Sequence, residues 1–156
     1  MHKVSSADQE QLIQLWQSAK NRLQYLTQND LVLIADKAKQ LTFKKGERLV
    51  EQGKQAKVLY LLGTGKVSVV VSGTQIAQIG PGETCGEMGF LEDSVASATA
   101  TAEQEVKAYA IEWPALHDLF ELFPHLASRF YRSLALNLSR RLREQIVSKQ
   151  SGKKTP

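Results

Sequence analysis

The segment GEMGFLEDSVASATATA, residues 86–102, has the composition of a loop that holds a small anion. Gly86 and Gly89 let the backbone approach a ligand closely because they carry no Cβ atom. A short helical turn is expected from Met88 onward, and the first N–H groups of such a turn lack partners within it and attract negative charge. Glu87 would repel a phosphate, but its carboxylate accepts hydrogen bonds from neighbouring hydroxyl groups.

The second half of this segment, Ala96-Ser97-Ala98-Thr99-Ala100, alternates small residues as a tight strand does. Ser97 and Thr99 carry hydroxyls that can donate to an anion, although the alternation by itself would also place them there. No lysine or arginine occurs between Lys66 and Lys107. A phosphate pocket built from this segment therefore has no cation of its own.

Other kinds of chemistry have no candidate residues. The three histidines are scattered, without Cys, Asp or Glu at the spacing of metal ligands, so neither a metal nor another cofactor is expected. Cys85 is expected to be a small buried apolar residue, because nothing basic nearby would lower the pKa of its thiol. Paired carboxylates, a nucleophile elbow and a P-loop are also missing from the pattern, which argues against an enzyme.

Composition indicates one soluble domain of 156 residues, long enough to bury about 68–70% of the surface of its unfolded chain. A lone cysteine, no signal peptide and only short apolar runs favour the cytoplasm and exclude a membrane span. The charge is uneven, since residues 129–156 hold eight Lys or Arg against the single Glu144. Such a segment binds nucleic acid or acidic lipid, or is simply a solvated helix face.

The elements that would position the pocket follow from the spacing of apolar residues and glycines. Helical spacing predicts two N-terminal helices, over residues 7–26 with Ser6 or Asp8 as cap, and over 29–39. From residue 41 to 112, glycines separate short runs rich in Val, Ile, Leu and Thr, which predict about eight strands. The expected fold class is mainly β with flanking helices: an eight-stranded, antiparallel, jelly-roll-like β-roll.

Helical spacing returns after Trp113. Pro114 suits the first turn of a helix, and Pro124 ends or bends that helix. Its expected apolar stripe consists of Leu116, Leu119, Phe120 and Phe123. A last helix is expected over about residues 125–150, followed by a short polar tail.

This order of elements resembles the cyclic nucleotide-binding domain family over about residues 23–146. Three segments carry the resemblance: FKKGERLVEQG at 43–53, VLYLLGTGKVSVVV at 58–71 with a turn glycine at Gly65, and GPGETCGEMGFLE at 80–92, which is similar to the phosphate-binding cassette. The implied organisation is a helical segment at 1–40, the β-roll at 41–112 with a cassette at 80–100, hinge and lid helices at 113–150, and a disordered tail at 151–156.

The resemblance implies a ligand site and one departure from it. The site would comprise Gly86, Glu87, Met88, Gly89, Ala96, Ser97, Ala98 and Thr99. In the family the glutamate that matches Glu87 holds the ribose 2′-hydroxyl, although bracing the turn is an equal alternative here. The family arginine that pairs with the cyclic phosphate is replaced by Ala96. Because hydrogen bonds to charged groups contribute about 1.5–3 kcal/mol, its loss should weaken phosphate binding about tenfold to a hundredfold.

Two residues of the last helix are candidates for a substitute cation. That helix packs over the ligand as a lid in the family, so Arg129 and Arg132 are expected to be able to reach the pocket. The resemblance also implies a hinge at about Leu122 to Leu126, where Pro124 interrupts the helix.

Two functions are therefore in competition. The first is a regulatory signalling module in which binding of cAMP or cGMP is weakened or lost. The alternative is a ligand-independent domain that interacts with an unidentified protein or forms a homodimer through its C-terminal helix. Sequence-specific DNA binding is not expected, because the chain ends within about ten residues of that helix and leaves no room for a reading element.

Overall fold

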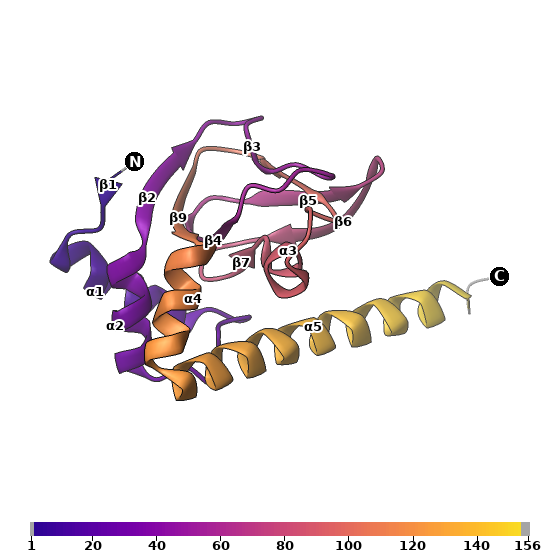
Figure 1. Cartoon of the computed structure of the whole chain (residues 1–156). Coiled ribbons are helices and arrows are strands. Elements are labelled where there is room, and N and C mark those ends of the chain that lie inside the picture. The colour runs from indigo at the N-terminus through magenta and orange to yellow at the C-terminus, as the bar shows by residue number, and fades with distance from the viewer. Residues whose placement is uncertain (1, 154–156) are drawn as a thin grey trace.

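The computed structural model describes residues 2–153, and the side chains of residues 4–150 (Figure 1). Helices stand before and after a rolled pair of sheets, and a short helix interrupts the strands. The elements are β1 (His2–Lys3), α1 (Ser6–Ser18), α2 (Gln28–Lys37), β2 (Lys39–Phe43), β3 (Arg48–Val50), β4 (Val58–Thr64), β5 (Val67–Val71), β6 (Thr74–Ile79), β7 (Thr84–Cys85), α3 (Glu87–Glu92), β8 (Thr99–Ala102), β9 (Val106–Glu112), α4 (Trp113–Leu122) and α5 (Pro124–Lys153).

Two antiparallel sheets form the roll. One has the strand order β1-β2-β9-β4-β7 and the other has β3-β8-β5-β6. Strands β2 to β9 confirm the eight-stranded roll that the glycine spacing predicts. The two-residue strand β1 was not expected, and it pairs antiparallel with the start of β2, with His2 opposite Gln40.

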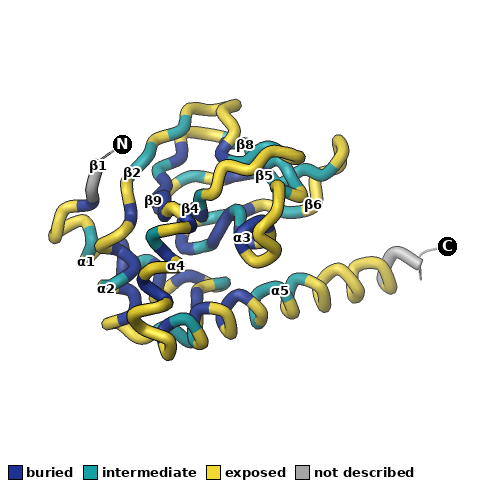
Figure 2. The backbone as a smooth tube through the Cα atoms, viewed as in Figure 1, coloured by how far each residue is buried: buried dark blue, intermediate teal, exposed yellow. Residues whose placement is uncertain are grey.

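Strand β4 lies between two apolar clusters and connects the roll to the helices. Its side chains alternate, so Leu59 and Leu61 pack with the helices, whereas Tyr60 and Leu62 pack between the sheets. Its neighbour β9 alternates in the same way. Figure 2 shows these two strands as buried along most of their length. Burial of both faces explains why β4 is an almost continuous apolar run instead of an alternating one.

The first helix ends earlier than its apolar spacing predicts. Helix α1 begins after Ser5, whose hydroxyl accepts the Asp8 N–H, and it ends at Ser18 instead of continuing to residue 26. The following residues form an irregular connection in which Leu23 is buried. Their apolar residues pack against neighbouring helices from an irregular backbone with two turns, so the sequence could not separate them from the helix. Helix α2 begins with a capping box between Thr27 and Asp30.

The two C-terminal helices are separated at Phe123, within the range where the sequence places a break. Leu116, Leu119 and Phe120 are buried, as expected. Phe123 is exposed because it lies at the corner itself, so it is not part of the buried stripe. Helix α5 continues to Lys153, and the first three residues of the expected disordered tail are therefore helical. The remainder of that tail, residues 154–156, lies outside the described residues.

Helix α5 is long and only partly covered. Its 30 residues correspond to a length of about 45 Å. The first half packs on the domain, and the last turns extend beyond the roll (Figure 1). Within the described residues, no helix combines the length and the apolarity that crossing a membrane requires.

Candidate functional site: a cavity between the roll and the last helix

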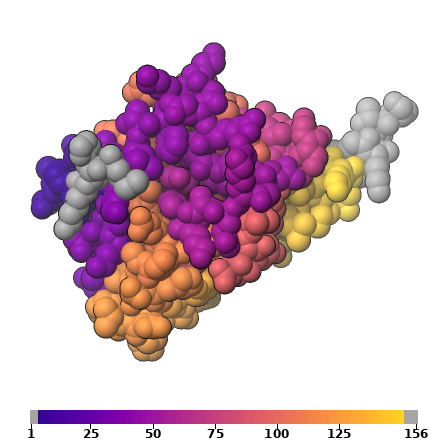
Figure 3. All heavy atoms as spheres, turned by 45° about the horizontal axis from the view of Figure 1, so that its top comes forward, coloured from indigo at the N-terminus to yellow at the C-terminus, as the bar shows by residue number. Residues whose placement is uncertain are grey.

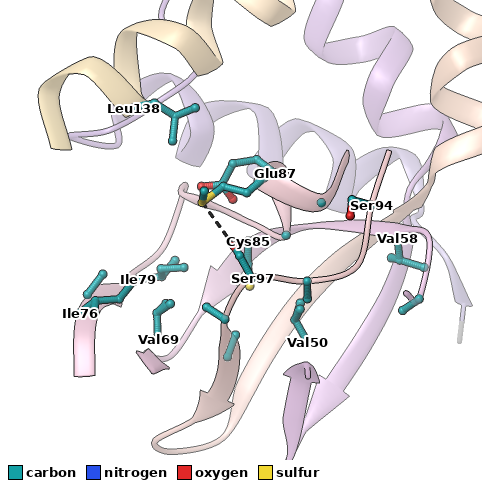
Figure 4. A pocket seen from close by; sticks show the side chains of 18 of the residues that line it. Val50, Val58, Val69, Ile76, Ile79, Cys85, Glu87, Ser94, Ser97 and Leu138 are labelled. Atoms are coloured by element: carbon teal, nitrogen blue, oxygen red, sulfur yellow. Dashed lines mark hydrogen bonds between the residues drawn. The ribbon is translucent and has the colours of Figure 1, made fainter. Parts of the chain in front are cut away.

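A cavity of about 310 Å³ lies between the roll, the segment around α3 and helix α5. This volume falls in the range of small-molecule sites, about 300–1,000 Å³. Val58, Val69 and Ile79 come from the strands, and Leu138 on α5 lies across the cavity from them (Figure 4). Most of the wall is apolar, which suits a ligand that carries a flat or apolar group.

Gly86 makes the sharp entry into α3. It has φ +89° in the left-handed region, which a residue with a Cβ rarely adopts. An added Cβ would also lie 3.3 Å from the Val58 carbonyl oxygen. No side chain caps the helix that follows. Gly86 is therefore required by the backbone, whether or not a ligand binds beside it.

The structure brings together most of the residues that the sequence assigns to the site. Lining the cavity are Gly86, Glu87, Met88, Gly89, Ala96, Ser97 and Ala98. Thr99 is not among the lining residues, and its hydroxyl accepts the Gln52 N–H at 3.0 Å. The Ser97 hydroxyl donates to the Met88 sulfur at 3.6 Å, a weak contact that a better acceptor would displace (Figure 4).

Arg141, a residue that the sequence reasoning missed, joins α5 to the cavity wall. Its Nη1 donates to Oε1 of Glu87 at 3.1 Å, and its Nη2 lies 3.9 Å from Oε2 of Glu83. The Glu87 side chain is only 8% exposed, against 32% for Arg141. Burial raises the pKa of Glu87, and the positive charge of Arg141 opposes this shift. The contact between Glu87 and Arg141 therefore connects α3 to α5.

A signal for Arg141 was present in the sequence. It lies three residues after Leu138 and immediately before Leu142, on the face of α5 that lines the cavity. Residues at this spacing share a helix face, so the apolar stripe that identified the helix also indicated which arginine faces the roll.

Arg129 and Arg132, the two expected lid residues, do not line the cavity. Arg129 makes a bidentate ion pair with Asp30, through Nε at 2.6 Å and Nη2 at 2.8 Å. The Arg132 guanidinium lies over the ring of Tyr25, 3.9 Å from its centroid. Arg129 precedes Arg141 by twelve residues, which is about 18 Å along the helix axis, so both earlier arginines meet the N-terminal segment instead.

A family model of the cyclic nucleotide-binding domain matches residues 40–122, which is more than half of the chain. The chain belongs to the cyclic nucleotide-binding domain family. Domains of this family act as regulatory modules.

Two curated relatives and one solved structure show how far the likeness extends. Glutaminase 2 of Bradyrhizobium diazoefficiens is 37% identical over 98 residues, 62% of this chain and 16% of that protein. Cyclic AMP receptor protein of Thermus thermophilus is 33% identical over 107 residues, 65% of this chain and 48% of that protein. The chain thus spans less than half the length of either relative.

The solved structure is a cyclic nucleotide-binding domain from Methylobacillus flagellatus. It superposes with a TM-score of 0.76 at 21% identity, over 90% of this chain and 83% of that chain. At this identity the likeness establishes the shared fold.

In this cyclic nucleotide-binding domain, the N-terminal segment holds the first half of α5 through contacts that lie outside the cavity wall. The Asp30–Arg129 pair connects α2 to α5, and Arg129 holds the pKa of Asp30 below its usual range. The Ser133 hydroxyl accepts the Tyr25 N–H at 2.9 Å. Asn137 donates to the Asn21 carbonyl at 3.0 Å. These contacts set where α5 crosses the roll.

Phe90 of α3 connects the cassette to both C-terminal helices. Its ring stacks on His117 of α4, with centroids 5.1 Å apart, and on Tyr131 of α5, 6.2 Å apart. It also makes edge contacts with Trp113 and Phe130. A displacement of α3 therefore acts directly on the corner between α4 and α5.

The buried thiol of Cys85 lies in the cavity wall. Burial raises the pKa of this thiol, and the negative charge of Glu87 raises it further. Cys85 therefore contributes packing to the wall and is not a nucleophile. Within the described part of the chain, no group of three or more His, Cys, Asp or Glu could hold a metal ion.

Proposed function

We propose that this domain is a regulatory module whose cavity accepts cAMP or cGMP with an affinity that Ala96 weakens. The observation that carries the proposal is the cavity of about 310 Å³ bounded by Glu87 on one wall and Ala96 on another. Membership of the family supports the class of ligand. The absence of a cation at position 96 supports the weakness of binding, because the cassette residues offer the phosphate no positively charged group.

In the proposed complex, Glu87 accepts a hydrogen bond from the ribose and Ser97 donates to the phosphate. Glu87 exchanges part of its contact with Arg141 for the ribose hydroxyl, so binding loosens one of the bonds between the roll and α5. The apolar wall, including Leu138, covers the base. This exchange couples occupancy of the cavity to the position of the lid.

The switch that follows uses the contacts of Phe90. Movement of α3 toward a ligand shifts Phe90 against Tyr131 and changes the corner at Phe123. A nucleotide can drive this change only if it binds one position of α5 more tightly than the other. Hydrogen exchange of α5, measured with and without nucleotide, follows the change directly.

Thermal unfolding with increasing cAMP or cGMP tests the binding. A ligand at 100 times its dissociation constant adds about 2.7 kcal/mol, and each kcal/mol raises the Tm of a domain of this size by about 2–4 °C. The Ala96→Arg variant should bind tenfold to a hundredfold more tightly than the wild type. Gln75→Arg, which adds the same charge at an exposed position outside the cavity, is the matched control.

A Tm that stays constant for both proteins at millimolar nucleotide would contradict nucleotide binding. A shift in Ala96→Arg alone would mean that the fold retains the pocket but the natural chain does not use it. Equal shifts in Ala96→Arg and Gln75→Arg would show that net charge, and not position 96, controls affinity.

A second candidate is a ligand-independent module that pairs with a second copy through α5. Leu142, Ile146 and Val147 are exposed on the second half of α5. The end of this helix projects from the body of the domain (Figure 3). Three apolar residues on a projecting helix are a surface that a second helix can cover. The basic residues Arg140 and Arg143 on this helix repel a copy of themselves, so added salt should strengthen the association.

Sedimentation velocity at several protein concentrations tests this candidate. The Leu142→Glu and Ile146→Glu double variant should be monomeric where the wild type is dimeric. A wild type that sediments as a monomer at high protein concentration and high salt would exclude it.

A further inference from the structure

The loop between β3 and β4 lies directly against position 96. The Gly53 N–H donates to the Ala96 carbonyl, and the Ala96 N–H donates to the Lys54 carbonyl, both at 2.9 Å. These two backbone bonds fix Lys54 beside the residue that stands where the family has its arginine. Both Lys54 and Ala96 line the cavity. The positively charged side chain of Lys54 is therefore available near Ala96, although Lys54 comes from a different part of the sequence.

The Lys54 ammonium can leave its ion pair and turn toward an anion with little loss of stability. Its side chain is 75% exposed and its Nζ lies 2.5 Å from Oε2 of Glu51. Such exposed pairs contribute little stability, because solvent screens them. Glu51 is also bound by Arg48, whose Nη1 lies 2.7 Å from Oε1. When Lys54 turns toward an anion, Glu51 thus keeps a positively charged partner.

Arg141, the cation on the opposite wall, is in a different position. It is bonded to the buried carboxylate of Glu87, and Glu83 lies close to its other nitrogen. If Arg141 turned fully toward an anion, the buried Glu87 would lose its charged partner, which is costly in a site with little solvent. The geometry therefore favours Lys54 over Arg141 as the residue that meets an added negative charge.

We propose that Lys54 supplies the positive charge for the phosphate of a bound cyclic nucleotide, in place of the arginine missing at position 96. This inference rests on the nucleotide binding proposed above. A lysine is a flexible point charge without the planar fork of arginine, so it restores only part of the affinity. The phosphate would lie beside Ala96, between the Lys54 ammonium and the Ser97 hydroxyl.

The test compares Lys54→Ala with two matched lysine variants. Lys57→Ala removes the other lysine of the cavity wall, and Lys45→Ala makes the same change in net charge at an exposed position outside it. NMR titrations suit weak binding, and two ligands are used: cAMP, and adenosine, which has no phosphate. Lys54→Ala should weaken cAMP binding by up to about fivefold and leave adenosine binding unchanged. Lys45→Ala should change neither.

A second variant predicts the opposite sign. Glu51→Gln releases Lys54 from its ion pair, so cAMP should bind more tightly. The gain should disappear in the Glu51→Gln and Lys54→Ala double variant, because it acts through Lys54. In the Ala96→Arg background the effect of Lys54→Ala should shrink, since the arginine then carries the contact.

The outcomes separate this inference from the proposed function. If the wild type binds cAMP and Lys54→Ala binds it equally well, the role of Lys54 is wrong and the proposed function stands. Equal losses for cAMP and adenosine, or for Lys54→Ala and Lys57→Ala, would also overturn it. If the wild type binds neither ligand, both proposals fail together.

Discussion

Replacing Arg141 with methionine should lower the free energy of unfolding by about 1–2 kcal/mol. Methionine keeps an unbranched apolar stem but removes the charge that Glu87 faces at 3.1 Å. Hydrogen bonds to charged groups contribute about 1.5–3 kcal/mol. Arg141 is 32% exposed, so solvent screening lowers the expected loss to about 1–2 kcal/mol, at or below the lower end of that range. The Tm should fall by about 2–8 °C for a domain of this size.

Replacing Arg141 and replacing Glu87 should lower the free energy of unfolding by different amounts. Without Arg141, a carboxylate remains in a mostly apolar wall, whereas Glu87→Gln leaves Arg141 partly solvated and near Glu83. Glu87→Gln should therefore destabilise less than Arg141→Met. The double variant should be more stable than Arg141→Met alone, because no charge is then stranded in the cavity.

The stability difference between Arg141→Met and the wild type should depend on pH. Burial raises the folded-state pKa of Glu87 above its ordinary value of 4.5. A carboxyl with a raised folded-state pKa stabilises the fold below its unfolded pKa, and that stability is lost as pH rises through the folded value. Without Arg141 the pKa rises further. The deficit of Arg141→Met relative to the wild type should therefore be small near pH 4.5 and grow toward neutral pH.

Urea unfolding between pH 4.5 and 8, followed by tryptophan fluorescence, measures this deficit. Arg143→Met, which removes an exposed arginine from the same helix, should have little effect at any pH. A deficit of the same size at every pH, or a double variant no more stable than Arg141→Met, would refute the assignment of Glu87 as a buried, charged partner of the lid.

Three further substitutions test other parts of the structure. Asp30→Asn should cost about 1–3 kcal/mol in urea unfolding at neutral pH. Because Arg129 lowers the pKa of Asp30 below 3.8, this stability is present above that pH, and the difference between wild type and variant should vanish as pH falls through the folded value. Gly65→Ala should cost about 1–3 kcal/mol, since Gly65 has φ +94° and an added Cβ would lie 2.5 Å from the Glu105 carbonyl. Phe90→Ala should cost about 3–5 kcal/mol in the same assay and should uncouple α5 from the cavity in hydrogen exchange.

Local sequence patterns are sufficient to predict the roll and the short helix that interrupts it. Turns that need a positive φ select glycine at positions such as Gly65 and Gly86, and apolar runs of strand length lie between them. These are local requirements of the backbone, so they are written in neighbouring residues. The lack of a cation in the cassette is equally local, since no lysine or arginine lies between Lys66 and Lys107.

The spacing of apolar residues did not predict where α1 ends. Helical spacing extended α1 to residue 26, although the helix ends at Ser18. An apolar residue such as Leu23 is buried whether its backbone is helical or extended, provided that a neighbouring element covers it. The neighbour here is remote in sequence, so periodicity alone cannot mark the end of the helix.

The charged residues around the cavity are brought together by packing between elements that are distant in the sequence. Arg129 and Arg141 lie on one continuous helix, and the rotation and crossing point of α5 direct the first to Asp30 and the second to Glu87. Lys54 reaches position 96 through backbone bonds between segments far apart in the chain. A helix pattern fixes which residues share a face, whereas packing against other elements fixes what that face contacts. This is why the sequence indicated the cassette segment but not the charged residues around the cavity.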